Sequence, residues 1–250
     1  MKEQIYTIPV NEVYDTDCEC PLCELEKKLE KETLDYVLGA AMMEPEFRME
    51  SNEKGFCNHH CSMLFGMSNK LALSLVLDTH LEEIRKKLDT LKKSASALKK
   101  QKGGLFKKTA SADFSKALSE KLDGISDGCV VCDKINHTME RYADVLLYMW
   151  ANDEKFKEKF NKSKGVCLKH MKLLVDTVPK SLKDSQAAQF LARLFEKQEA
   201  ELSRIQEDIH KFTLKFDYRN KDMEWGTAQD APIRTIDKIS AFINNDYEEK

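Results

Sequence analysis

The sequence is poor in residues that interrupt helices. Its 250 residues include only nine glycines and five prolines, whereas 33% are charged and 42% are hydrophobic. Few helix breakers among many Lys, Glu and Leu residues favour long helices. No alternation of apolar and polar residues with a period of two, the pattern of strands, stands out. We therefore predict an all-α fold.

Long apolar runs are also missing. The longest mostly apolar run, Leu71 to Leu77, is far shorter than the roughly 20 residues that a membrane helix requires. The first twenty residues lack the continuous apolar stretch of a secretory signal. We therefore expect a soluble, cytoplasmic protein with no membrane partner. In such a reducing compartment, clustered cysteines are more often metal ligands or redox groups than disulfides.

The motifs of several common enzyme classes are absent as well. The sequence has no His-Glu-x-x-His, no phosphate-cradling Gly-x-x-x-x-Gly-Lys and no Gly-x-Gly-x-x-Gly. Paired catalytic carboxylates cannot be singled out among 43 acidic residues. The sequence thus offers no candidate catalytic residue and no site for an organic cofactor, which favours a protein that is not an enzyme.

What the chain does have is a repeated cysteine pattern. Cys20-Pro-Leu-Cys23 matches Cys129-Val-Val-Cys132 at an offset of 109 residues, and Gly55-Phe-Cys57-Asn-His-His60 matches Gly165-Val-Cys167-Leu-Lys-His170 at an offset of 110. Flanking positions also align, for example Phe47 with Phe156. Similarity at a fixed spacing indicates an internal duplication, so we predict two repeats.

Each repeat is predicted to form a helical hairpin that a metal ion holds together, followed by a long helix. Apolar residues recur at steps of three and four after each Cys-x-x-Cys. The long helices are expected at about 68–100 and 180–215, the second with Pro179 as its first residue. The predicted regions are a first repeat (1–100), a basic, partly flexible linker (101–128), a second repeat (129–215) and a C-terminal loop and helix (216–250).

The duplicated residues have the chemistry of a metal site. Three cysteines and one histidine are a common structural zinc set, and helix N-termini favour thiolates. Cys18, His59 and Cys61 are further candidates, but they have no counterpart in the second repeat. We predict two zinc ions per chain, with an iron–sulfur cluster as the alternative. The predicted ligands are Cys20, Cys23, Cys57, His60, Cys129, Cys132, Cys167 and His170.

The spacing allows each repeat to close on its own ion. Between the two motifs of the first repeat lie 33 residues, Glu24 to Phe56. A helix of about 20 residues carries the chain ~30 Å away, and the remaining ~13 residues can span at most ~43 Å. Closure within a repeat is therefore feasible and is our first interpretation. The same arithmetic leaves ligation across the repeats open.

The pattern resembles an uncharacterised bacterial protein family, a domain of unknown function with paired Cys-x-x-Cys and Gly-x-Cys-x-x-His units. The resemblance covers nearly the whole chain, including the tail around Lys215-Phe216-Asp217-Tyr218-Arg219-Asn220. It implies a fold and a metal, but no reaction.

Two functions remain open at this stage. The first is a non-enzymatic binding or adaptor protein, because structural zinc sites with four protein ligands leave no open position for water. The second is a redox or metal sensor that uses the Cys-rich first site, where Cys18 and Cys61 are spare thiols.

Partners are suggested by helix faces and charge. A protein can bind the long amphipathic helices. Residues 85–108 hold ten Lys or Arg against one acid, Asp89, which gives a net charge of about +9 and can attract nucleic acid, although such runs are usually solvated helix faces. The 216–230 loop is either a ligand pocket or a cap packed over the repeats. His80, His137 and His210 read as ordinary helix residues.

Overall fold

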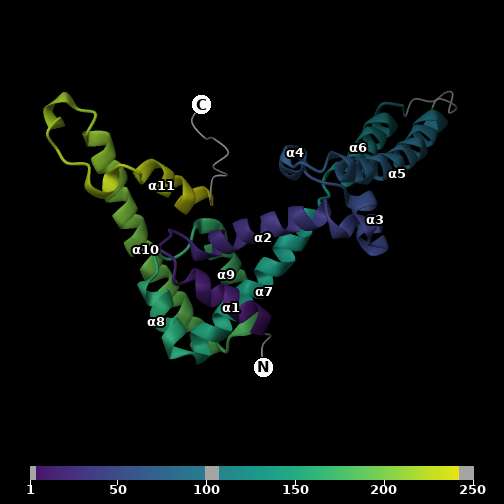
Figure 1. The fold of residues 1–250 in the computed structure, drawn as a ribbon. Coiled ribbons are helices and arrows are strands. Elements are labelled where there is room, and N and C mark those ends of the chain that lie inside the picture. The colour runs from purple at the N-terminus through teal and green to yellow at the C-terminus, as the bar shows by residue number, and fades with distance from the viewer. Residues whose placement is uncertain (1–3, 99–106, 242–250) are drawn as a thin grey trace. The chain divides into compact units, whose positions relative to one another are not determined.

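The computed structural model describes residues 4–98 and 107–241, and this part of the chain is helical with no strand, which confirms the all-α prediction (Figure 1). None of the described helices combines the length and apolar character that a membrane span requires. In chain order the α-helices are α1 (Gln4–Val13), α2 (Pro21–Val37), α3 (Pro45–Lys54), α4 (Asn58–Gly66), α5 (Lys70–Leu98), α6 (Lys107–Ser126), α7 (Val130–Asn152), α8 (Glu154–Lys162), α9 (Leu168–Ser181), α10 (Asp184–Leu214) and α11 (Ala231–Ser240), with short 3₁₀ turns at Ala40–Met43, Tyr218–Asn220 and Gly226–Ala228.

The chain divides into two compact units that do not coincide with the two predicted repeats. Unit 1 consists of Met1–Lys28 and His137–Lys250, and unit 2 consists of Leu29–Asn136. The boundaries fall inside α2 and α7, so each of these helices contributes residues to both units. Each unit therefore receives its Cys-x-x-Cys motif from one repeat and its Gly-x-Cys-x-x-His motif from the other.

Unit 1 is built around an aromatic core. Trp150 of α7 meets Phe190 of α10 edge-on at 5.0 Å between ring centroids, and Tyr14 meets Phe156 of α8 at 5.1 Å. All four side chains are buried. Burying a large apolar side chain contributes roughly 1.5–3 kcal/mol, so these contacts fix α10 against α7 and α8 against the end of α1.

The C-terminal helix of unit 1 is hydrogen-bonded to the segment before the first cysteine pair. Helix α11 packs on α9 and α10 (Figure 1). Its fully buried Lys238 donates to the backbone carbonyls of Glu19, at 2.8 Å, and Lys164. Glu19 directly precedes Cys20, and Lys164 precedes Gly165 of the second motif. A buried ammonium held by carbonyls thus ties together the two loops that carry the ligands.

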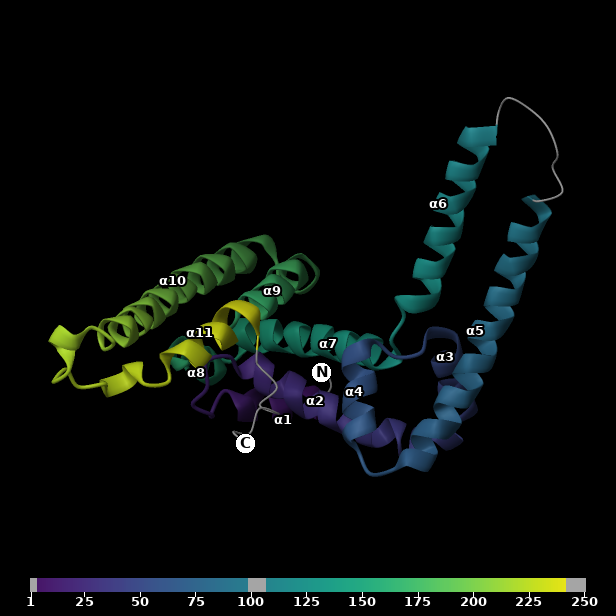
Figure 2. The same cartoon turned by 90° about the horizontal axis from the view of Figure 1, so that it is seen from above.

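Unit 2 packs α3 and α4 against the long helix α5, and α6 also contacts α5 (Figure 2). Arg48 of α3 donates to Thr79 Oγ1 of α5 at 2.8 Å, and Leu64 and Val76 are fully buried. Helix α6 occupies most of the 101–128 stretch that the sequence suggested as a linker, while residues 99–106 lie outside the described part.

One helix boundary was predicted wrongly. Pro179 was expected to open the long second helix, but α9 continues through it to Ser181, and α10 starts at Asp184. The buried side chains of Leu174 and Val178 give α9 a packing gain that outweighs the hydrogen bond lost at a proline. The helix therefore stops two residues beyond Pro179 rather than before it.

Candidate metal centres

The structure brings all eight predicted ligands together in two groups of four. Within each group the candidate ligand atoms all lie within 4.8 Å of one another. Site 1, in unit 1, consists of Cys20, Cys23, Cys167 and His170; site 2, in unit 2, consists of Cys57, His60, Cys129 and Cys132. Each group can hold a metal ion.

The pairing runs across the repeats and not within them, so our first interpretation of the spacing was wrong on this point. Closure within a repeat requires an extended return segment, but after α2 (Pro21–Val37) the chain forms the 3₁₀ turn Ala40–Met43 and helix α3 (Pro45–Lys54). The part of α2 from Cys23 to Val37 carries the chain ~21 Å away. Helix α3 advances the chain by only ~15 Å and packs on α5, so the chain does not return to Cys20 and Cys23. Cys57 therefore meets the start of α7, and Cys167 meets the start of α2.

Each site is formed where two helices begin. Cys57 and Cys167 are the N-cap residues of α4 and α9, and the ligand histidines lie in the first turns of those helices. The two Cys-x-x-Cys pairs stand in the same way at the starts of α2 and α7. Because the N-terminus of a helix carries partial positive charge, two helix starts favour the thiolate form of the cysteines that they surround.

The backbone conformation explains why each Gly-x-Cys-x-x-His motif begins with glycine. Gly55 and Gly165 have φ angles of 66° and 77°, a left-handed region that is costly for other residues. A Cβ at Gly55 would lie 2.2 Å from His80 Nε2. The carbonyl of Gly55 also accepts a hydrogen bond from Val130 N at 3.1 Å. This turn therefore joins the two halves of site 2.

In site 1 the four ligand atoms face a common point. His170 Nδ1 lies 3.3–3.4 Å from each of the three sulfurs, and Cys23 Sγ lies 3.6 Å from Cys167 Sγ. All four residues are at most 3% exposed, so site 1 is closed to solvent.

Site 2 has the same geometry but is more open. His60 Nδ1 lies 3.2–3.4 Å from its three sulfurs, and Cys57 Sγ lies 3.8 Å from Cys132 Sγ. Cys57 and Cys132 are partly exposed, whereas His60 and Cys129 are buried. Of the two sites, site 2 is thus the one that solutes can reach.

The ligands of site 1 shift the pKa values of one another. Burial lowers the pKa of His170, but hydrogen bonds with Cys167, Cys23 and Glu26 outweigh it and raise the pKa to about 11. Hydrogen bonds from Cys20 and Cys23 in turn lower the pKa of the Cys167 thiol. The lowered pKa favours the Cys167 thiolate, which is the form that binds a metal ion.

Two carboxylates that sequence reasoning missed lie behind the ligand histidines. Glu26 Oε2 is 3.2 Å from His170 Nε2, and Glu30 Oε1 is 3.1 Å from His60 Nε2. The only available signal was their spacing: Glu26 and Glu30 follow Cys23 at three and seven residues, on one face of α2.

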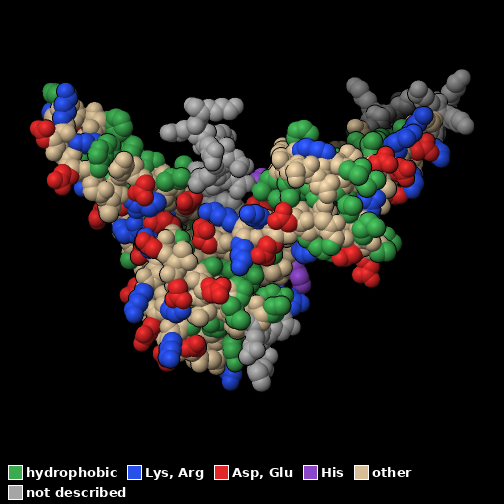
Figure 3. Space-filling view, viewed as in Figure 1, with side chains coloured by type: hydrophobic (Ala, Val, Ile, Leu, Met, Phe, Trp, Pro, Cys, Tyr) green, Lys and Arg blue, Asp and Glu red, His purple; other side chains and the backbone are tan. Residues whose placement is uncertain are grey.

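The remaining cysteines and the C-terminal loop have other surroundings. Cys18 and Cys61 belong to neither group of four; burial raises the pKa of both thiols, that of Cys18 to about 11. In the 216–230 loop, the rings of Phe216 and Trp225 lie tilted against that of Phe212 at the end of α10, at 5.3 and 5.4 Å between centroids, and Figure 3 shows apolar side chains over this tip.

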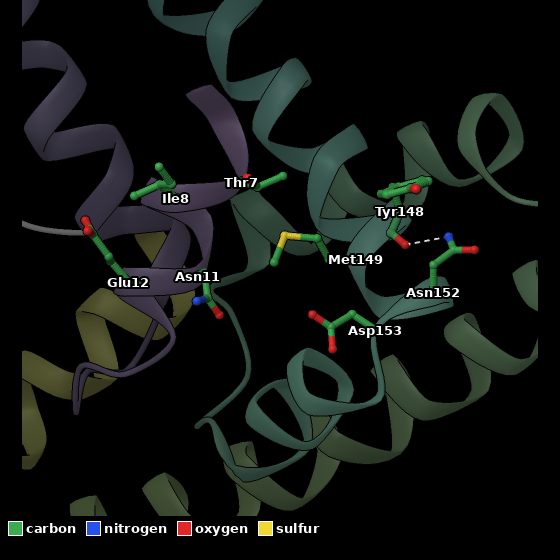
Figure 4. Close-up of a pocket in the computed structure, with 8 residues that line it drawn as sticks. All are labelled: Thr7, Ile8, Asn11, Glu12, Tyr148, Met149, Asn152 and Asp153. Carbon is green, nitrogen blue, oxygen red and sulfur yellow. Dashed lines mark hydrogen bonds between the residues drawn. The ribbon is translucent and has the colours of Figure 1, made fainter. Parts of the chain in front are cut away.

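A separate cavity of about 460 Å³ in unit 1 offers little chemistry. It lies between α1 and α7 and is lined by Thr7, Ile8, Asn11, Glu12, Tyr148, Met149, Asn152 and Asp153 (Figure 4). Asp153 caps α8 by accepting hydrogen bonds from the backbone of Lys155 and Phe156. With that carboxylate engaged and no Cys or His in the lining, the two four-residue groups remain the candidate site.

Comparison with protein families matches residues 1–246 to DUF6062, a family of unknown function. The match covers more than half of the chain, so the protein belongs to this family. Neither the curated proteins nor the solved structures give a match.

Proposed function

We propose that the protein binds two structural zinc ions, one at site 1 and one at site 2, and works without catalysis as a binding or adaptor protein. The observation that carries the proposal is the convergence of four ligand atoms from two chain segments at each site. Zinc takes tetrahedral Cys₃His sets with Zn–S near 2.3 Å and Zn–N near 2.0 Å, which places the ligand atoms roughly 3.5–3.8 Å apart. The separations of 3.2–3.8 Å support such a tetrahedron.

The proposed sites are closed by protein ligands. Catalytic zinc keeps one position for water or substrate, whereas each of these groups supplies four ligand atoms. The burial of every ligand of site 1 also favours a structural role over hydrolysis, because substrate has no path to the ion.

A protein partner fits the surface better than nucleic acid does. Helix α5 exposes Leu71, Leu75 and Leu81, an apolar face that another protein can cover. In the described part of the basic segment, Lys86 and Lys93 pair with Glu83 and Asp89 on the same helix, which reduces the charge available to phosphates.

Metal analysis tests the zinc proposal directly. Protein purified without added metal is expected to contain two zinc ions per chain by elemental mass spectrometry and to be colourless. A brown protein with iron and sulfide would instead support an iron–sulfur cluster. Well-folded protein without any metal would overturn the proposal.

A second candidate function, redox-triggered zinc release, is supported by the partial exposure of Cys57 and Cys132. Their two thiolates would lose two electrons and form a disulfide, hydrogen peroxide would take these electrons with two protons and become two waters, and the zinc ion would leave. The Cys-rich start of the chain does not share this access, because Cys20 and Cys23 are buried.

Under peroxide we expect site 2 to lose its zinc before site 1, because only site 2 exposes ligand sulfurs. Alkylation followed by peptide mass spectrometry reports when the cysteines of each site become free or oxidised. Cys61→Ser is the control, since this nearby thiol is not one of the four ligands. Equal rates at the two sites would contradict a sensor role.

A further inference from the structure

In both sites the ligand histidine contacts a glutamate, and that glutamate contacts a second side chain. In site 1, Lys169 donates to Glu26 Oε1 at 2.5 Å, and Glu26 Oε2 lies 3.2 Å from His170 Nε2. In site 2, His59 Nε2 is 3.0 Å from Glu30 Oε1, which is 3.1 Å from His60 Nε2. The residue preceding each ligand histidine therefore contacts the carboxylate that contacts that histidine.

The burial pattern is also alike. The Lys169 and His59 side chains are each 53% exposed, the two glutamates are each 9% exposed, and the histidines are 1% and 4% exposed. Within the described residues, the buried His170 Nε2 and Glu26 Oε2 have no hydrogen-bond partner, and the 3.2 Å contact between them is an ion pair. A polar atom buried this deeply needs a partner, so the carboxylate and the imidazole depend on each other.

The chemistry of imidazole explains the arrangement. A neutral histidine that binds metal through Nδ1 carries its proton on Nε2 and donates it. A carboxylate that accepts this proton fixes the tautomer and the ring orientation and makes the ligating nitrogen more basic.

A separate metal site made of Glu30, His59 and His60 is a weaker interpretation, although the three ligand atoms lie close enough together. His60 uses Nδ1 toward the sulfurs of site 2, so its Nε2 carries a proton and cannot bind a second cation. Glu30 is thus better explained as the acceptor of two N–H groups.

We propose that Glu26 and Glu30 are positioning residues for the two zinc sites, and that Lys169 and His59 hold these carboxylates in place. This inference rests on the proposed zinc binding. Both carboxylates come from α2, four residues apart on one face. The corresponding positions of α7 hold Ile135 and Met139, which are buried and apolar, so α7 cannot provide the same contact.

The test compares Glu26→Gln and Glu30→Gln in the full-length zinc-loaded protein, with Glu24→Gln and Glu32→Gln as matched controls on the more exposed side of α2. Zinc loss to an excess of chelator is followed at each site by alkylation of its own cysteines. We expect Glu26→Gln to speed zinc loss from site 1, and Glu30→Gln from site 2, by about 10–100-fold. The controls are expected to behave as the wild type.

Two further readouts separate positioning from packing. The visible spectrum of the cobalt-loaded protein is expected to change for Glu30→Gln, since the ligand field reports the orientation of His60. His59→Lys, which copies the Lys169 contact of site 1, is expected to retain zinc as the wild type does, whereas His59→Ala loses it faster.

Failure of the positioning role can be distinguished from failure of the proposed zinc binding. A wild type without zinc would remove the zinc proposal and this inference together. A wild type with two zinc ions, but with unchanged loss in both glutamine variants, would overturn the positioning role alone. Faster loss from both sites in each single variant would also overturn it, because a general loss of stability would then be the cause.

Discussion

Replacing Cys20 and Cys167 together by serine is expected to leave one zinc ion per chain, whereas replacing Cys20 and Cys57 together leaves none after a chelator challenge. The first pair removes two ligands from site 1 and leaves site 2 intact. The second pair removes one ligand from each site. Since structural zinc relies on four protein ligands, both weakened sites should then release their ion to the chelator.

This experiment decides between the two pairings, because closure within the repeats predicts the reverse result. In that case the Cys20 and Cys57 pair would leave one ion, and the Cys20 and Cys167 pair would leave none. The double variant of Cys18 and Cys61 is the control and is expected to keep two ions, since neither thiol belongs to a group of four.

The second large effect concerns stability. Cys167→Ser is expected to lower the melting temperature of unit 1 by about 10 °C or more, because metal binding free energy is folding free energy in such sites. The binding of structural zinc is worth roughly 10–16 kcal/mol in small domains. In a domain of this size, each kcal/mol of lost stability lowers the melting temperature by ~2–4 °C. Losing even about 3 kcal/mol would therefore lower it by ~6–12 °C. Calorimetry with and without added zinc measures it.

Cys61→Ser is the matched control for this prediction, since it makes the same chemical change outside the ligand sets. Its melting temperature is expected to stay within about 2 °C of the wild type, because most substitutions away from such features cost less than about 0.5 kcal/mol. A chelator should lower the wild-type melting temperature as the Cys167 substitution does. Equal melting temperatures for Cys167→Ser and Cys61→Ser would show that site 1 does not stabilise the fold.

Much of the helical architecture could be predicted because it follows from local chemistry. Few glycines and prolines, together with apolar residues at steps of three and four, indicated helices that the structure contains. Exceptions arise where packing overrides local preference. Helix α9 continues through Pro179 because the side chains of Leu174 and Val178 are buried. Helix α6 occupies most of the stretch that was predicted as a linker.

The supporting carboxylates could not be predicted for a different reason. Glu26 and Glu30 are two of 43 acidic residues, and nothing local distinguishes them from the other glutamates of α2. Their role depends on His170 and His60, which lie 144 and 30 residues further along the chain. Similarly, the proposed role of His59 depends on its contact with Glu30, which the sequence does not reveal.

The eight candidate ligands were determined by the sequence itself, because residue type sets ligand chemistry and the duplication separates the four matched positions of each repeat from the spare cysteines. Which four share a site was decided only by the tertiary structure. Three thiols and one imidazole are the same set in either pairing, so chemistry alone does not choose between them. The choice follows from the segment after α2, where a 3₁₀ turn and α3 shorten the stretch that would have to reach back to Cys20 and Cys23, so that their remaining partners come from the start of α9.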